Sequence, residues 1–485
     1  MRSTFALACT SIALAAAAAC ATAGDEADTS PANDAGSSPL ADTGTDGRPS
    51  SEADAGDAAV PVDARCSAAG WCTTLLPDRD LTLKDIWPFE QRAFAIAESP
   101  TLGVKVLEWE SASDEWRYID DNTQNDYGAG QYAGKIWAPS ENEVYYAVAR
   151  ARIYRGTRPT PSSPWTWQYD VLESHSPDED PTRDPGLARY AYKRDLPPVD
   201  AAALGVWGTS EGDVYAWYGN TVFRRRSEGG APAWVPDYVA EDGENPTDVF
   251  YILGAAGSTS GDLWFAGSRG QFDTEGGLFA CPLVVHRTAE GHRHIVDNVV
   301  NQAADPNNRW AGICSANPGS LGFSVSIQIP GYGTFTRPWP NGGMLSSIAS
   351  VGPNRAVGLM GRNQGDIFTY VSTDDAGIAS ANVVNVSVPR ADVQTYLNSV
   401  WVLGTTAWFS GWGLVIKSED GPEKWSRGFG LAKPDDNTPA AGSYEISTLA
   451  LNGAAFDRPF YQVRGISNSN LWAIGAGYAL HKTTP

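Results

Sequence analysis

The chain has 485 residues and a formal net charge of −22, with 57 acidic residues against 35 Lys and Arg. This balance argues against binding to nucleic acid or to anionic lipid by charge, because both need clustered positive residues. We interpret the acidity as a source of solubility outside the cell.

Residues 1–19 have the pattern of a secretory signal peptide. Arg2 precedes an almost unbroken run of Ala, Leu and Ile that is too short to span a membrane. Three alanines and Cys20 follow, an arrangement that resembles the lipobox of bacterial lipoproteins, in which the cysteine carries the lipid. We predict an outer-membrane or cell-surface lipoprotein anchored through Cys20. The alternative is cleavage after Ala23, which gives a soluble periplasmic or secreted protein.

Residues 20–65 form a segment of different composition. Ten acidic residues and two arginines are spread among Ala, Gly, Ser, Thr and Pro, with no aromatic residue. Such a segment cannot bury enough apolar surface to offset the entropy lost on ordering. We predict a disordered acidic tether over 20–65, followed by one folded domain over 66–485.

Four cysteines lie in the predicted domain, in addition to Cys9 and Cys20. An even number in an exported chain favours disulfides, and proximity suggests the pairs Cys66–Cys72 and Cys281–Cys314. A four-cysteine zinc site is disfavoured because the second pair lacks close spacing.

A short pattern recurs seven times along the predicted domain. An apolar pair, often Val-Trp or Ile-Trp, is followed by a polar turn and a second apolar run, as in 205–217. The copies are centred near residues 86, 136, 206, 252, 348, 400 and 464. The shorter intervals match one blade of a β-propeller. We predict an all-β, single β-propeller of seven four-stranded blades, with six or eight as alternatives, the eighth copy lying at 310–325.

The ends of the copies suggest how the ring closes. In several copies a third strand is followed by a fourth that begins with a tryptophan, at Trp116, Trp167, Trp234 and Trp425. The last copy ends at the C-terminus without such a strand, whereas residues 67–76 have the same appearance and precede the first copy. We predict that this N-terminal strand completes the last blade, which removes an exposed sheet edge.

The stretches 206–224 and 471–482 resemble the VWG…DVWAVG repeats of secreted bacterial β-propeller lipoproteins, which are similar in style to BNR, WD40 and kelch propellers. The resemblance covers nearly all of 66–485. It implies an architecture and says little about activity, because propellers serve many unrelated functions. We expect the repeated tryptophans to pack between blades, since periodic apolar positions form cores.

Residues that interrupt the repeat are the candidates for function. His292 and His294 alternate along one predicted strand near Asp297 and His286, which makes them weak candidates for metal ligands. Asp178 and Asp180 lie in a charged insertion and are weak candidates for calcium. Otherwise we expect no cofactor, and catalytic and binding residues are unknown. No nucleophile elbow, zinc-protease motif or phosphate loop is present in the sequence.

We predict a monomeric binding or scaffolding module of the cell envelope, which holds a protein or glycan partner and does not bind nucleic acid. It contacts the membrane only through its N-terminal lipid. An enzyme is the less favoured alternative, either a glycoside hydrolase of the BNR type or a polysaccharide lyase. A third alternative is a purely structural spacer.

Overall fold

A computed structural model describes residues 65–484, with gaps at 129–131, 174, 176–202, 211–212, 228, 273–277, 301–313, 323, 330–332, 339–342, 362–365, 374–378, 387–396, 422–423, 425–443, 448, 452–455 and 457. These residues belong to one compact unit, Pro61–Pro485. The predicted signal peptide, Cys20 and almost all of the predicted tether lie outside the described residues. So do Asp178 and Asp180.

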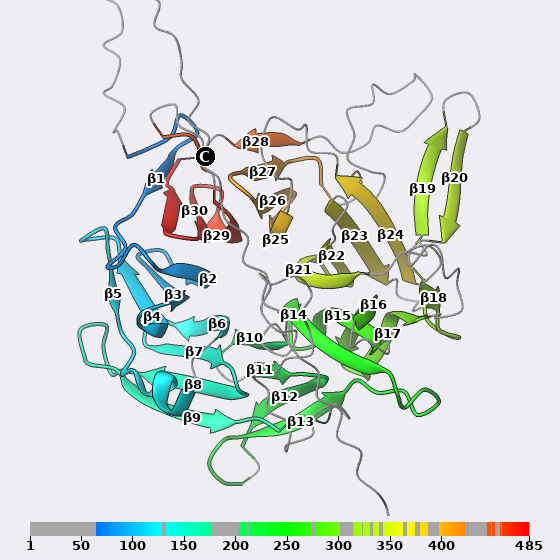
Figure 1. The fold of residues 1–485 in the computed structure, drawn as a ribbon, viewed down its shortest axis with the longest axis horizontal. Coiled ribbons are helices and arrows are strands. Elements are labelled where there is room, and N and C mark those ends of the chain that lie inside the picture. The colour runs from blue at the N-terminus through cyan, green and yellow to red at the C-terminus, as the bar shows by residue number, and fades with distance from the viewer. Residues whose placement is uncertain are drawn as a thin grey trace, which may run out of the picture. The chain divides into compact units, whose positions relative to one another are not determined.

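Seven sheets form a ring, and within each blade the consecutive strands pair antiparallel (Figure 1). The first sheet contains β2 (Thr82–Pro88), β3 (Arg92–Ser99), β4 (Gly103–Glu110) and β5 (Glu115–Tyr118). The second contains β6 (Ala133–Ser140), β7 (Glu143–Val148), β8 (Arg152–Thr157) and β9 (Thr166–Val171). The third contains β10 (Leu204–Ser210), β11 (Asp213–Tyr218), β12 (Thr221–Arg226) and β13 (Ala233–Val239). A short 3-10 helix, η1 (Thr123–Gly128), joins the first two sheets.

The fourth sheet has five strands and the fifth has six. The fourth contains β14 (Val249–Thr259), β15 (Asp262–Phe272), β16 (Leu278–Thr288), β17 (Gly291–Val300) and β18 (Cys314–Ala316). The fifth contains β21 (Met344–Gly352), β22 (Arg355–Gly361), β23 (Asp366–Thr373) and β24 (Ala379–Val386), with β19 (Ser324–Ile329) and β20 (Gly333–Pro338) added at its outer edge.

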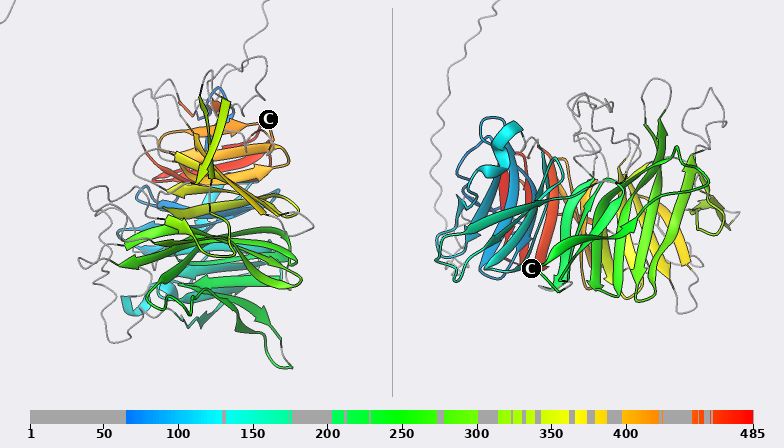
Figure 2. Two further views of the ribbon diagram at one scale, coloured as in Figure 1. Left: turned by 90° about the vertical axis from the view of Figure 1, so that its right-hand side faces the viewer. Right: turned by 90° about the horizontal axis from the view of Figure 1, so that it is seen from below.

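The sixth sheet contains β25 (Leu397–Leu403), β26 (Thr406–Gly411), β27 (Val415–Ser418) and β28 (Glu445–Ser447). The seventh contains β29 (Phe460–Ser467), β30 (Asn470–Gly475), β31 (Tyr478–Lys482) and β1 (Trp71–Thr73). Figure 2 shows the same sheets from the side, with strands running across the thickness of the ring. Among the described residues, no helix is long and apolar enough to cross a membrane.

The predicted seven-bladed β-propeller is confirmed. Each of the seven repeat positions lies in an innermost strand, namely β2, β6, β10, β14, β21, β25 and β29, and each of these strands contacts the next around the ring. The contact between β29 and β2 closes the circle. The proposed eighth copy at 310–325 is wrong, because β18 and β19 instead extend the edges of the fourth and fifth blades. The fourth strand of the sixth blade is also placed differently from the prediction: it is β28, and Trp425 lies outside the described residues.

The N-terminal strand closes the last blade as the sequence predicts. β1 pairs antiparallel with β31, so that Trp71 lies opposite Lys482 and Thr73 lies opposite Leu480. The Trp71 ring is fully buried, meets Trp408 of the sixth blade edge-on at 6.1 Å, and donates a hydrogen bond to Ser447 Oγ at 2.8 Å. The Trp71 indole therefore links strand β1, which belongs to the seventh blade, to the sixth blade.

Both predicted disulfides are present. Cys66–Cys72 encloses the chain just before β1, and Cys281–Cys314 joins β16 to the added strand β18. Such bonds form and persist in oxidising compartments, which fits an exported protein.

Most blades share a polar and aromatic triad that the sequence analysis assigned to simple turns. A polar residue begins the second strand, an aromatic residue stands two positions later, and the third strand places a basic residue or histidine opposite that ring. The triads are Glu143–Tyr145–Arg155, Asp213–Tyr215–Arg224, Asp262–Trp264–His286 and Asn470–Trp472–His481. His286 Nε2 lies 2.8 Å from Asp262 Oδ1 while the imidazole stacks on Trp264 at 3.9 Å. The triad therefore ties together the second and third strands of these blades.

Tryptophans of the second strands pack between blades, as expected. Trp217, Trp264, Trp408 and Trp472 are all fully buried. Burial of side chains this large removes apolar surface from water and is worth about 2–3 kcal/mol each. Indoles also explain the glycine that follows Trp207. A Cβ atom on Gly208 would lie 2.8 Å from the Trp137 ring of the preceding blade.

Replacing Trp71 with alanine tests the closure. We expect Trp71→Ala to lower the free energy of unfolding by about 3–5 kcal/mol, because it leaves a cavity at the junction of two blades. Chemical denaturation measures the change. Leu75→Ala is the control in the same segment, since that side chain is 61% exposed, and it should shift the value by less than about 0.5 kcal/mol. Equal effects of the two substitutions would contradict the closure.

Acid should weaken the ring through His481. Burial between Trp109 and Trp472 lowers the pKa of His481 to about 4 from its ordinary value of 6.5. Between those pH values the unfolded chain binds a proton at this residue and the folded chain does not, so the free energy of unfolding falls as pH falls. In denaturation curves recorded from pH 7 to 4, His481→Gln should show a shallower decline. His175→Gln, at an exposed position, should keep the wild-type slope.

Candidate functional site

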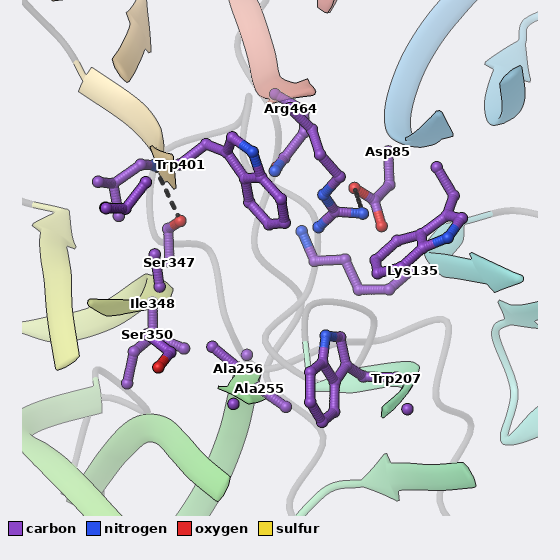
Figure 3. Close-up of a pocket in the computed structure, with 18 of the residues that line it drawn as sticks. Asp85, Lys135, Trp207, Ala255, Ala256, Ser347, Ile348, Ser350, Trp401 and Arg464 are labelled. Atoms are coloured by element: carbon purple, nitrogen blue, oxygen red, sulfur yellow. Dashed lines mark hydrogen bonds and ion pairs between the residues drawn. The ribbon is translucent and has the colours of Figure 1, made fainter. Parts of the chain in front are cut away.

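A cavity of about 490 Å³ lies where the seven innermost strands meet (Figure 3). This central cavity receives residues from every blade, and its wall includes Asp85, Trp87, Lys135, Trp207, Ala255, Ala256, Ser347, Ala349, Trp401, Gln462 and Arg464. Its volume lies within the ~300–1,000 Å³ that is common for small-ligand sites. We therefore take it as the candidate site.

One repeated position shapes this wall. In each blade, a residue of the innermost strand pairs across the ladder with the third residue of the second strand, which is usually aromatic. Around the ring these residues are Trp87, Trp137, Trp207, Ala256, Ala349, Trp401 and Arg464. The fourth and fifth blades thus replace tryptophan with alanine, and the seventh replaces it with arginine.

These replacements make the cavity asymmetric. Trp87, Trp207 and Trp401 present indoles to it, whereas β14 contributes glycine and alanine, and β21 contributes serine, glycine and the smaller aliphatic residues Ile348, Ala349 and Val351. Trp137 does not line the cavity; it is buried and packs edge-on against Trp87 at 6.1 Å. The repeated inner tryptophans therefore do more than the packing role expected of them: three of them also line the cavity.

Arg464 occupies the place of the missing tryptophan in the seventh blade. Its guanidinium lies 5.0 Å from the Trp87 ring and 5.1 Å from the Trp401 ring. Nη1 donates to the Ile86 carbonyl at 2.7 Å and lies 3.3 Å from Asp85 Oδ1. Burial lowers the pKa of Arg464 and the Asp85 charge opposes that change, while a guanidinium remains protonated at any ordinary pH.

Asp85 joins two blades at the cavity wall. Its Oδ2 accepts a hydrogen bond from the Ile136 amide at 3.0 Å, and its Oδ1 faces Arg464. Ser347 and Ser399 make the equivalent bond to the following blade, to the amides of Val400 and Val463. Asp85 thus makes, with a charged side chain, the hydrogen bond between neighbouring blades that serines make elsewhere in the ring.

Lys135 extends its amine toward the middle of the cavity, between Arg464 and Trp207 in the view of Figure 3. No hydrogen bond or ion pair within 4 Å joins this amine to any part of the chain that the structure describes. Burial lowers the pKa of Lys135, Asp85 partly offsets this, and the charges of Arg464 and Lys84 lower it further. The site therefore holds a basic group whose charge is incompletely balanced.

The predicted metal ligands lie away from the central cavity, on β17. His292 stacks on Tyr238 at 4.7 Å, and His294 Nδ1 lies 3.0 Å from Asp297 Oδ2. Asp297 also pairs with the buried Arg269. Burial lowers the pKa of His292 to about 4. Within the described ranges, no group of three His, Cys, Asp or Glu side chains is arranged to hold a metal ion.

The sequence analysis did not single out Asp85, Lys135 or Arg464. A signal was nevertheless available, because aligning the seven copies places Arg464 at a position where four copies carry tryptophan. Asp85 and Lys135 each stand directly before the apolar residue of an Ile-Trp pair. The sequence alone does not show that these three side chains meet in one cavity, since they come from blades at opposite ends of the chain.

Comparisons with known proteins found no matching family model and no curated protein with a significant match. Solved structures with a similar fold include YCF48 from Cyanidioschyzon merolae, with 11% identity and a TM-score of 0.44 over 86% of this chain and 99% of that one. Another is the Cps50 (Swd1) β-propeller domain of Myceliophteria thermophila, with 7% identity and a TM-score of 0.45 over 84% and 100%. The polysaccharide lyase Uly1 is similar at 10% identity, with a TM-score of 0.39 over 83% and 90%. Similarity this low indicates nothing about function.

Proposed function

We propose that this protein is an exported binding module whose propeller receives a glycan in the central cavity. The observation that carries the proposal is the replacement of the repeated tryptophan in three blades, which leaves three indoles and two basic side chains around one cavity. Indole faces pack against the C–H faces of sugar rings, and a few placed polar groups orient the ligand. A protein partner fits less well, because the distinctive residues line a cavity and not an extended face.

The location at the cell envelope is part of the same proposal. We propose that Cys20 carries a lipid and that residues 20–65 hold the ring away from the membrane, with the protein acting as a monomer. Support comes from the sequence pattern, from the two disulfides, and from a ring that closes within one chain.

Substitution of Cys20 tests the anchor. In cells that express the full chain, we expect the wild type in the membrane fraction and Cys20→Ser in the soluble fraction, because one thioether-linked diacylglycerol carries most of the membrane affinity. Cys9→Ser is the matched control and should stay with the membrane. Membrane association of the Cys20→Ser protein would refute lipidation at this residue.

An enzyme is the second candidate, favoured by one observation. Burial lowers the pKa of Lys135, and Arg464 lies beside it. In an elimination reaction on an acidic sugar, an amine with a lowered pKa can act as the base, and a neighbouring guanidinium can pair with the sugar carboxylate. Hydrolysis with two carboxylates fits less well, since Asp85 is the sole carboxylate among the described wall residues. Release of unsaturated chain ends from a polysaccharide would move the assignment to a lyase.

Trp207→Ala tests the binding site itself. On an array of oligosaccharides, we expect this variant to lose at least about tenfold in affinity for whichever glycan the wild type binds. The substitution removes an apolar surface whose burial contributes about 1.5–3 kcal/mol to binding. Tyr169→Ala, an aromatic substitution on the outer strand β9, should bind like the wild type. Wild-type affinity in the Trp207→Ala protein would remove the cavity from the proposal, and the absence of any glycan ligand would favour a structural spacer.

A further inference from the structure

Positive charge exceeds negative charge in the central cavity. Lys135, Arg464 and Asp85 are the charged residues of its described wall, so the two basic groups share one carboxylate. Asp85 Oδ2 accepts a hydrogen bond from the Ile136 amide, while Oδ1 lies 3.3 Å from Arg464 Nη1 in an ion pair and accepts no hydrogen bond from the described residues. A buried charge without a partner is costly, and the cost falls when an anion enters. The cavity is therefore electrostatically incomplete without an anionic group.

The unused edge of Arg464 indicates the shape of that group. Both close contacts of its guanidinium use Nη1, while Nε is buried and has no hydrogen-bond partner among the described residues. An unsatisfied buried donor of this kind calls for an acceptor that the protein does not supply. The Nε edge of a guanidinium offers parallel N–H groups, whose spacing matches the two oxygens of a carboxylate.

The rest of the wall suits the body of a sugar. Trp207 and Trp401 offer flat apolar surfaces, and Ala256 and Ala349 leave room where other blades carry an indole. Ser347 uses its oxygen to accept from the Val400 amide, which leaves its hydroxyl proton able to donate. A ring with apolar faces, hydroxyl groups and one carboxylate combines these features.

We propose that the central cavity binds a uronic acid residue of an acidic saccharide, with the sugar carboxylate held between Arg464 and Lys135 and the ring packed on the indoles. This inference rests on the proposed function, of which it names the ligand class. The net charge of −22 repels polyanions from the outer surface, so recognition depends on the cavity and not on a charged face. Added salt screens this repulsion but screens the buried pair poorly, so the affinity for an oligouronate should not fall as the ionic strength rises.

Proton uptake provides a signature that a structural role would not produce. The charged groups that act on Lys135 are Asp85 and Lys84 from β2 and Arg464 from β29. An incoming carboxylate favours the protonated amine, which reverses the effect of burial and raises the pKa of Lys135. Below the pKa of Lys135 in the free protein the amine is charged, and the cavity carries its excess of positive charge. Near and above that pKa, binding should take up a proton at Lys135, and the affinity should fall as pH rises.

Calorimetry on the full chain tests the proposal with matched ligands. The probes are oligogalacturonate and oligoguluronate, the methyl ester of each, and inorganic phosphate, titrated in buffers of different ionisation enthalpy. At least one oligouronate should bind, and its methyl ester, which is almost the same size but uncharged, should bind at least about tenfold more weakly. Phosphate alone should not compete at comparable concentration.

Two variants and one control complete the experiment. Lys135→Met should weaken oligouronate binding at least about tenfold and abolish proton uptake, because it removes the titrating charge while keeping a side chain of similar length. Arg464→Gln should weaken binding as well, with its thermal unfolding recorded because this residue also holds the Ile86 carbonyl. Lys424→Met is the control, since that ammonium pairs with Asp420 at 2.8 Å outside the cavity wall, and its affinity should stay within about twofold of the wild type.

The outcomes separate this inference from the proposed function. Equal binding of acid and ester, or unchanged proton uptake in Lys135→Met, would overturn the uronate assignment, while binding that still depends on Trp207 would preserve the glycan-binding module. Phosphate that binds and displaces the saccharide would identify an oxyanion site and would also overturn the assignment. Binding of no saccharide at all would overturn both.

Discussion

The propeller depends on the antiparallel pairing of its two chain ends. β1 and β31 pair in the seventh blade, and the Trp71 indole of β1 contacts Trp408 and donates a hydrogen bond to Ser447, both in the sixth blade. Each blade packs on two neighbours, so a ring with one incomplete blade would leave an open sheet edge and an unsupported face. Residues separated by almost the whole length of the domain thus hold the innermost strands in a circle.

A closed circle makes each repeated position a ring of seven side chains. Positions in the middle of the blades remain uniform, because all blades meet the same packing requirement. The triads of the second and third strands show this, with Asp262, Trp264 and His286 in one blade and Asn470, Trp472 and His481 in another. Asp262 and His286 share a hydrogen bond, as do Asn470 and His481, while the indole nitrogens of Trp264 and Trp472 have no hydrogen-bond partner among the described residues.

The innermost position has a freedom that the others lack. Its side chains point toward the axis, where packing does not require the same residue in every blade. Alanine in two blades opens space, and Arg464 with Lys135 and Asp85 adds charge on one side. Departure from the repeat at this position therefore creates a polarised cavity without disturbing the blades that surround it.

Architecture was largely predictable because it depends on local periodicity. The seven copies of the repeat, four of them with Val-Trp or Ile-Trp, located all seven innermost strands, and the missing final strand indicated that residues near Trp71 complete the ring. The errors occurred where local pattern is weak. The eighth copy at 310–325 was assigned from apolar spacing alone, although its described strands serve as extra edges of two blades. His292 and His294 were singled out for their spacing, with Asp297 close in sequence, yet the stacking of His292 on Tyr238 comes from packing between the third and fourth blades, which spacing does not reveal.

The sequence by itself predicted the fold class, the closing strand, the two disulfide pairs and seven blades with six or eight as alternatives, because each follows from repetition or from a small number of possible partners. The structure decided the number of blades and the pairing of the cysteines. Only the tertiary structure decided which residues share the central cavity. Asp85, Lys135 and Arg464 belong to blades one, two and seven, and they meet because the ring brings the end of the chain back to its beginning. Chemistry at the axis depends on distances across the circle, and a linear pattern contains no measure of those distances.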